Sequence, residues 1–532
     1  MPDPDDPSRE PAGGEGRRGD DPSPEPAGGE RRRGDDPSPE LDAAAATAEV
    51  VPGDVLDADE VRRRAAGGAA ALGVRNAVLL AAGVVVNLVL ARLLAPADFG
   101  LVALGQTLVL VGGYLSSGGI GVALVGRREP PARRELEAVL GVQLAAAAAL
   151  AAIFALAALP FGRDGAVVAL MLATLPLSTL RLPQSIALER ELRFRTIATV
   201  DVVELLAQYA WALATVAAGA GVWGLASAVV VRGIAGAVAM VRLSELGWVR
   251  PRLSWREVRP LVAFGARFQA AAGVSVARDQ LLNAGIAAIA GLGTLGVWAL
   301  AFRVMQVPLL LFTTLYRVSY PAMAKLLAAG RDPRAAIERG VALTGVAIAF
   351  IVVGIAAGAP ALVPALLGDR WDAVPPILGL GGIALMITCP VSAATVGWLY
   401  AAGDPGTVLR AFAAHAALWL VVALALLEPV GPEAIGIGWI AGALGDATVL
   451  GLAAARRTGA RVARRLAPPL IAALAAGGAG WAISATSETV GAGVLGLAAG
   501  EAILLATLLL LANRLLREAV ALAREGLREA GA

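Results

Sequence analysis

The sequence contains one cysteine, one histidine and little charge. Because Cys389 stands alone, an intrachain disulfide and a cysteine metal cluster are both excluded. His415 lies in an Ala-rich stretch, where a lone histidine is typical of a packed side chain rather than of a ligand. Only 17% of the 532 residues are charged, fewer than in soluble proteins of this length. These absences predict no metal site and no cofactor, and we expect no nucleic-acid partner.

The sequence is rich in long apolar runs. Hydrophobic residues make up 57% of the chain, and the mean hydropathy is +0.69. Stretches of about twenty apolar residues, long enough to cross a bilayer as helices, recur from Leu72 to Leu511. They are built from Ala, Leu, Val and Gly, as helices packed within lipid often are. The predicted fold class is therefore an all-α polytopic membrane protein.

The first 66 residues differ from the rest in composition. The segment DPSREPAGGEGRRGD (6–20) repeats as DPSPEPAGGERRRGD (21–35), and a third copy begins at Asp36. Pro, Gly and charged residues dominate, so this segment has too little apolar surface to form a core. It also lacks the apolar centre of a signal peptide. We predict a disordered cytoplasmic tail over 1–66.

The remainder predicts about fourteen transmembrane helices. Their approximate ranges are 72–94, 99–125, 136–159, 165–187, 198–219, 222–243, 261–290, 294–322, 340–367, 375–400, 407–427, 434–455, 467–485 and 490–513. Arginine and lysine concentrate in the even-numbered connections, whereas the odd-numbered ones hold only Arg92, Arg163 and Arg370. Since short basic loops stay in the cytoplasm, we predict a multi-pass protein of the cell membrane with both termini cytoplasmic.

An internal repeat relates the two halves of the chain. FGLVALGQTL (99–108) opens the second predicted span and LGVWALAFRV (295–304) opens the eighth, so that Gly100 matches Gly296. An interval of six helices predicts two parallel, pseudo-symmetric six-helix lobes, with two extra helices after them. The predicted parts are an N-lobe (67–243), an interlobe linker (244–260), a C-lobe (261–458), the two extra helices (459–513) and an amphipathic cytoplasmic helix (514–532).

Four segments of the chain resemble a known transporter family. They are ARLLAPADFGLVAL (91–104), RELRFRTIATVD (190–201), DQLLNAGIAAIAGLGTLGVWALAFRV (279–304) and LLGDRWDAVPPILGL (366–380). The chain is similar to the polysaccharide-transporter branch of the multidrug/oligosaccharidyl-lipid/polysaccharide exporter superfamily over roughly 72–460. The resemblance implies an oligosaccharide flippase of cell-surface polysaccharide (lipopolysaccharide) biosynthesis, and a transporter rather than an enzyme.

Ionisable residues inside the predicted spans are candidates for function, because burying them in lipid is costly. The seventh span carries Arg267 and Arg278, eleven residues apart and thus on one helix face. The eighth carries Arg303 and Gln306. Guanidinium groups match phosphate oxygens bidentately and stay charged when partly dehydrated. These four residues form the predicted substrate site, a cleft that binds the pyrophosphate and glycan.

The same charges also allow internal ion pairs. Arg303 could pair with Asp279, and Arg232 with Glu204. Asp201 and Glu204, on one stripe of the fifth span, either bind a coupling cation or proton or neutralise Arg232. The sequence leaves these alternatives open.

The sequence therefore predicts a flippase that moves a polyprenyl-pyrophosphate-linked oligosaccharide from the inner to the outer leaflet by alternating access. Its expected partners are that lipid-linked oligosaccharide, membrane lipids, a monovalent cation or proton, and polysaccharide-assembly proteins. One alternative is an exporter of amphiphilic cations or drugs from the same superfamily, which should expose carboxylates in its cleft. A membrane glycosyltransferase or polymerase would need catalytic residues in a sizeable loop, and a scaffold would use the tail to dock partners.

Overall fold

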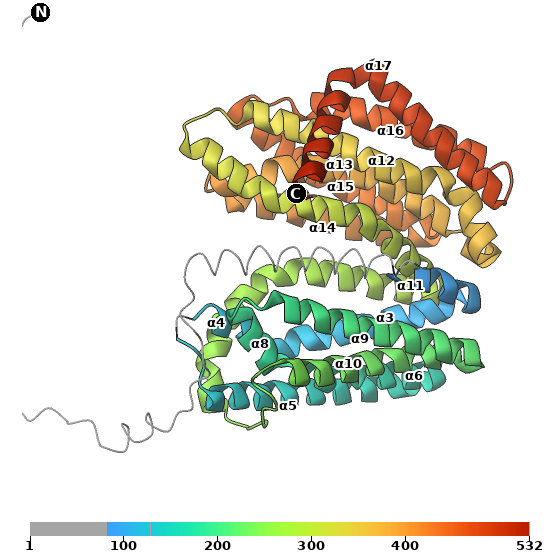
Figure 1. Ribbon diagram of the computed structural model, residues 1–532. Helices are drawn as coiled ribbons and strands as arrows, with labels where there is room; N and C mark the ends of the chain where they lie inside the picture. The colour runs from blue at the N-terminus through green and yellow to red at the C-terminus, as the bar shows by residue number, and fades with distance from the viewer. Residues whose placement is uncertain (1–81, 84, 128, 531–532) are drawn as a thin grey trace, which may run out of the picture. The chain divides into compact units, whose positions relative to one another are not determined.

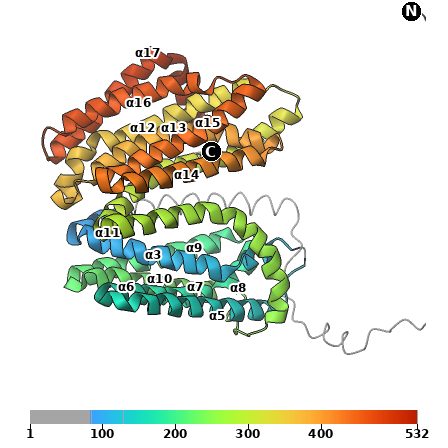
Figure 2. The ribbon, with the colours of Figure 1, turned by 180° about the vertical axis from the view of Figure 1, so that it is seen from behind.

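The computed structural model describes residues 82–83, 85–127 and 129–530, apart from some side chains within the helices. The predicted tail (1–66) and residues 72–81 and 84 of the first predicted span (72–94) lie outside these residues. Every regular element of the described part is helical (Figures 1 and 2). After helical turns at 85–93, the elements are α3 (Pro96–Ser117), α4 (Ile120–Val125), α5 (Arg133–Ala158), η1 (Leu159–Phe161), α6 (Gly162–Leu172), α7 (Thr174–Thr179), α8 (Leu182–Arg190), α9 (Phe194–Thr215), η2 (Val216–Ala220), α10 (Val222–Leu243), α11 (Trp255–Ala328), α12 (Arg334–Leu367), η3 (Asp369–Trp371), α13 (Val374–Ala401), α14 (Pro405–Val430), α15 (Glu433–Thr458), α16 (Val462–Ser484) and α17 (Val490–Ala530).

The helices confirm an all-α polytopic membrane protein. Within the described residues, 11 segments are long and apolar enough to cross a bilayer. Helices suit this setting because they satisfy their backbone hydrogen bonds internally, where lipid offers no partners. Two of these segments, Arg133–Thr179 and Val276–Thr313, each contain parts of two predicted spans. The count of fourteen, the lobe boundaries and the linker stay predictions.

Helix α11 is a hairpin of two antiparallel legs. The backbone at Gly291 has φ 79° and ψ 176°, a conformation that glycine adopts without strain. On either side of this break, Trp298 Nε1 donates a hydrogen bond to Asn283 Oδ1 at 3.2 Å. Residues fifteen apart on a straight helix would be about 22 Å apart, so the two legs must fold back on each other. The predicted seventh and eighth spans are thus the legs of one hairpin.

Glycines bring α3 and α11 into backbone contact at both ends of α3. A methyl group built on Gly100 would overlap the Leu292 carbonyl, and one built on Gly296 would overlap the Pro96 carbonyl. Near the other end, Gly119 and Gly265 approach each other in the same way. The two glycines matched in the repeat therefore lie against each other. Only residues without a Cβ allow helices to approach this closely.

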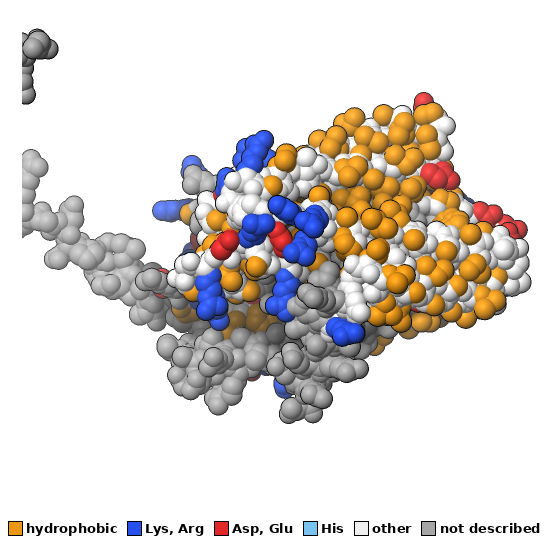
Figure 3. All heavy atoms as spheres, turned by 90° about the horizontal axis from the view of Figure 1, so that it is seen from above, with side chains coloured by type: hydrophobic (Ala, Val, Ile, Leu, Met, Phe, Trp, Pro, Cys, Tyr) orange, Lys and Arg blue, Asp and Glu red, His pale blue; other side chains and the backbone are white. Residues whose placement is uncertain are grey.

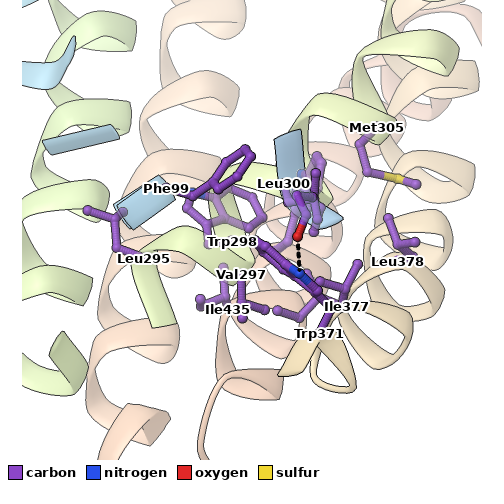
Figure 4. Close-up of a cluster of buried hydrophobic side chains, with 14 of the residues drawn as sticks. Phe99, Leu295, Val297, Trp298, Leu300, Met305, Trp371, Ile377, Leu378 and Ile435 are labelled. Carbon is purple, nitrogen blue, oxygen red and sulfur yellow. Dashed lines mark hydrogen bonds between the residues drawn. The ribbon is translucent and has the colours of Figure 1, made fainter. Parts of the chain in front are cut away.

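The end of the bundle near Gly100 is closed by side chains from distant segments. Trp371 Nε1 donates to the Ala91 carbonyl at 3.0 Å, the hydrogen bond drawn in Figure 4. The ring of Phe99 meets the ring of Trp371 edge-on, with centroids 5.3 Å apart. Arg92 Nη1 donates to the Leu366 carbonyl at 2.6 Å. The first and ninth predicted connections, both of the odd-numbered set, thus meet at this end.

Charge is sorted along the bundle. Arg190 reaches the carbonyls of Leu124 and Arg127, and Arg457 pairs with Asp404 at 2.7 Å, so even-numbered connections meet one another. In Figure 3, lysine and arginine side chains gather at one end of the face shown, beside a broad apolar surface. Leucines such as Leu495 and Leu510 are exposed, and exposed apolar side chains are suited to contact with lipid.

Helices α16 and α17 pack on α12 through small residues. The carbonyl oxygen of Gly496 lies 2.5 Å from a methyl group built on Gly480, and Ala357 of α12 contacts the same position. Small residues let helices approach closely where lipid provides no hydrophobic driving force. The two helices after the predicted lobes are therefore firmly attached to the second half of the chain.

We predict that Gly296→Ala destabilises the protein, because its methyl group would force α11 away from α3. Overpacking of this kind typically costs about 1–3 kcal/mol. Gly293→Ala is the matched control, since a methyl group there meets nothing within 4 Å. Thermal unfolding of the purified protein in detergent should show a lower Tm for Gly296→Ala and no loss for Gly293→Ala. Equal Tm values for the two variants would contradict the observed contact.

Candidate functional site

A cavity of about 510 Å³ with charged residues in its wall lies between helices of the first half and the second leg of α11. Its wall comes from Gly83, Asn87 and Leu88, from α3, α7, α9, α10 and α11, and from Arg181 in the turn between α7 and α8. Four charged residues line it: Arg181, Glu204, Arg232 and Arg303. Volumes of this size are typical of sites for small molecules or head groups.

Glu204 of α9 holds two of the arginines together. Its Oε2 lies 2.5 Å from Arg181 Nη1, and its Oε1 lies 3.0 Å from Arg232 Nη2. The Glu204 side chain is only 4% exposed, whereas those of Arg181 and Arg232 are 30% and 44% exposed. One carboxylate therefore stays buried between two guanidinium groups that still reach the cavity. The Arg232–Glu204 ion pair that the sequence allowed is present.

A glycine makes room for this arrangement. A methyl group on Gly236 of α10 would crowd the Glu204 carboxylate and approach Arg181 Nη1 to 3.3 Å. The absent side chain leaves space for the carboxylate between α9 and α10. Helices α9 and α10 and the turn that carries Arg181 therefore depend on one another for their positions around the cavity.

Arg303 of α11 has a neutral partner. Its Nη1 donates to Asn87 Oδ1, and Asn87 Nδ2 donates in turn to the Gly83 carbonyl at 2.6 Å. Within the residues that the structure describes, no carboxylate pairs with Arg303, and its charge is not neutralised there. Gln306 lies one turn further along the cavity wall, and Gln208 Oε1 is buried near it without a hydrogen-bond partner from the described residues. Among the described residues, the cavity therefore offers positive charge together with one unsatisfied amide oxygen.

The structure separates the predicted substrate residues into two groups. Arg303 and Gln306 line the cavity, but Arg278 does not. Arg278 Nη2 lies 2.7 Å from Asp279 Oδ1, and its guanidinium carbon lies 5.2 Å from the centroid of the Trp419 ring. Asp279 thus pairs with Arg278 rather than with Arg303. The side chain of Arg267 is outside the described residues.

Asp201 and Glu204, the two residues of the predicted stripe, lie on α9 together with Gln208. Glu204 and Gln208 line the cavity, whereas Asp201, one turn before Glu204, does not. Two cavity residues, Arg181 and Asn87, were not predicted. Both lie within predicted spans (165–187 and 72–94), so the cost of burying polar groups in lipid was a usable signal for them.

The sequence is similar to a known protein family and to a bacterial protein. A family described as "Polysaccharide biosynthesis protein" matches residues 89–376. The lipopolysaccharide biosynthesis protein WzxC of Escherichia coli (strain K12) is 24% identical over 334 residues, which cover 60% of this chain and 66% of WzxC, just under two thirds of its length.

Two solved structures share the fold. The lipid II flippase MurJ, in an inward closed conformation, matches with a TM-score of 0.68 and 10% identity over 84% of this chain and 99% of MurJ. A multidrug resistance MATE family transporter of the MOP superfamily, in an inward-facing conformation, matches with a TM-score of 0.52 and 15% identity over 71% of this chain and 95% of that one.

We predict that Glu204→Gln lowers the Tm of the purified protein, because two guanidinium groups lose their shared carboxylate. The free energy of unfolding should fall by less than 3–5 kcal/mol, roughly the cost of breaking a fully buried pair, since both arginines are partly exposed. Glu245→Gln is the control: Glu245 pairs with Arg193 at 2.6 Å, but its side chain is 84% exposed. Such a surface pair contributes at most about 1 kcal/mol. A larger Tm loss in Glu245→Gln than in Glu204→Gln would contradict this account.

Proposed function

The chain belongs to the polysaccharide biosynthesis proteins of the multidrug/oligosaccharidyl-lipid/polysaccharide exporter superfamily, and we propose that it flips a polyprenyl-pyrophosphate-linked oligosaccharide from the inner to the outer leaflet. The chain is a multi-pass membrane protein and a transporter, not an enzyme. In this proposal it works in the cell membrane with both termini in the cytoplasm. It would act beside the proteins that assemble the surface polysaccharide.

The sign of the cavity carries the proposal. Arg181, Arg232 and Arg303 face it, but Glu204 is its only carboxylate among the described residues. A pyrophosphate carries negative charge on several oxygens, and guanidinium groups bind such oxygens with two parallel hydrogen bonds. An exporter of amphiphilic cations would need the opposite excess of charge. The cavity therefore favours an anionic head group.

Arg303 is the residue best placed to receive that head group. Arg181 and Arg232 share the Glu204 carboxylate, whereas Arg303 is held by the side-chain oxygen of Asn87. A phosphate oxygen could replace this neutral partner and gain a charge-assisted hydrogen bond. Gln306 and Gln208 would bind neighbouring phosphate or sugar oxygens, and the polyprenyl tail would remain in the bilayer.

Alternating access requires the two halves of the chain to separate at one end at a time. The observed contacts between α3 and α11, Gly100 with Gly296 and Gly119 with Gly265, close both ends of α3. Opening the Gly119 end would admit the head group from the cytoplasm. Opening the Gly100 end, with release of Trp371 from Ala91, would deliver it to the outer side.

We predict that Arg303→Ala abolishes surface polysaccharide in cells that depend on this chain, while the protein still reaches the membrane. Arg303→Lys should restore only part of the activity, because an ammonium group cannot bind phosphate bidentately. The control is Arg163→Ala, which removes an exposed arginine in the first turn of α6. The assay measures surface polysaccharide and the amount of each variant in the membrane fraction. Normal polysaccharide in Arg303→Ala would argue against a head-group site at this cavity.

A further inference from the structure

The connection between α10 and α11 has a surface that the proposed transport mechanism does not use. Residues 247–254 are not helical, and their backbone is hydrogen-bonded to the start of α5. The Arg252 amide donates to the Glu137 carbonyl at 2.9 Å, and Arg133 Nη2 donates to the Trp248 carbonyl at 3.1 Å. These hydrogen bonds hold the connection against α5.

The inward-facing groups of this connection are packed or paired. Val249 is 1% exposed. A methyl group built on Gly141 of α5 would overlap the Arg252 carbonyl, so the connection packs closely on this helix. In the first turn of α11, Glu257 Oε1 lies 2.6 Å from Arg252 Nη2 and 3.2 Å from Arg134 Nε. The connection is therefore seated on the bundle, and its other long side chains face outward.

Three of the outward side chains are large and apolar. Trp248 is 51% exposed, Leu253 is 75% exposed, and Trp255, the first residue of α11, is 58% exposed. Single exposed apolar residues are common on proteins, but several close together mark a contact surface. An indole ring combines an apolar body with an N–H donor, which suits the head-group level of a bilayer. The connection therefore has the composition of a membrane-interface segment.

Arginines are interspersed with these apolar side chains. Arg250, Arg256 and Arg259 are exposed, and no carboxylate of the described residues pairs with them. Arg252, in the same stretch, is instead paired with Glu257. Guanidinium groups bind phosphate oxygens with two parallel hydrogen bonds. The outward face thus combines apolar and aromatic side chains with positive charge that the described residues do not neutralise.

We propose that this outward face binds the head groups of anionic phospholipids. The occupant follows from the setting, because α10 (Val222–Leu243) is long and apolar enough to cross the bilayer and the connection begins directly after it. The two tryptophans and Leu253 would enter the interface, while the three arginines hold phosphate oxygens. A phosphatidylglycerol head group has a net negative charge and a phosphatidylcholine head group has none, so charge should decide between these lipids.

The position of this face gives lipid binding a consequence for the bundle. Gly265 lies ten residues after Trp255 on the same leg of α11, about 15 Å along the helix. Gly265 is in backbone contact with Gly119, at the end of α3 that the proposed function opens toward the cytoplasm. Lipid bound at the start of α11 would therefore favour one position of this leg and change the rate of opening. This consequence rests on the proposed flippase function, whereas the lipid binding does not.

The single cysteine allows a local probe of this face. In a Cys389→Ala background, a spin label is attached to Leu253→Cys, and its accessibility to a water-soluble nickel complex is measured in nanodiscs. We expect phosphatidylglycerol added to phosphatidylcholine nanodiscs to lower this accessibility. A label on Ala329→Cys, an exposed position in the connection between α11 and α12, should stay accessible in both lipid mixtures. A label at position 253 that is equally accessible in both mixtures would overturn the proposal in favour of a protein partner.

The arginines are tested with the same label. Replacing Arg250, Arg256 and Arg259 together by glutamine should remove the difference between the lipid mixtures. The control replaces three other exposed arginines, Arg331, Arg456 and Arg464, by glutamine and should keep the difference. Inorganic phosphate added to phosphatidylcholine nanodiscs should leave the label accessible. Shielding by phosphate alone, or an unchanged lipid response in the first triple variant, would overturn a phospholipid site at these arginines.

The consequence for transport is tested in vesicles that contain the purified protein and a labelled polyprenyl-pyrophosphate oligosaccharide. We expect phosphatidylglycerol to change the flipping rate of the wild type, but not that of the variant without the three arginines of the connection. A wild-type rate that is equal in both lipid mixtures would overturn the effect on opening. If the wild type moves no such lipid in either mixture, the flippase proposal fails, and the spin label still decides whether the connection binds anionic lipid.

Discussion

An ionised side chain within a bilayer has to be paired or hydrated, because the hydrocarbon around it offers neither charge nor hydrogen bonds. This constraint organises the interior of the bundle. Glu204 compensates Arg181 and Arg232, and Asp279 compensates Arg278. Arg303 is left with a neutral amide at the wall of the cavity. Since Glu204 is on α9, Arg232 on α10 and Arg181 in the turn between α7 and α8, the same pairs also fix how these segments are aligned.

The contacts between α3 and α11 have a different physical character. They combine close glycine backbones with neutral hydrogen bonds, from Asn283 to Thr107 and between Gln269 and Tyr114, and among the described residues no ion pair joins the two helices. Separating such surfaces breaks no buried charge pair, so it costs less than pulling apart a salt bridge in lipid. Each of the charge pairs named above thus lies within one half of the chain, and the surfaces proposed to separate are held by uncharged contacts. This division suits a protein that opens alternately at two ends.

The sequence was sufficient for those features that depend on composition and period. Apolar runs predicted helices, and the repeat predicted that Gly100 and Gly296 are equivalent. It was insufficient for the direction of side chains across a hairpin. Asp279 and Arg303 are equally far from Gly291, so a hairpin could join them, yet rotation about each leg turns Asp279 toward Arg278 and Arg303 toward Asn87. Helical period fixes which residues share a face, but only packing decides what that face meets.

The most direct test of the head-group site is to photo-crosslink a diazirine-bearing polyprenyl-pyrophosphate saccharide to the purified protein in vesicles and map the labelled peptides by mass spectrometry. The account predicts labelling of the α9 segment around Glu204 to Tyr209 and of the α11 segment around Leu300 to Gln306, competed by unlabelled lipid-linked oligosaccharide. Competed labelling confined to segments outside the cavity would contradict it.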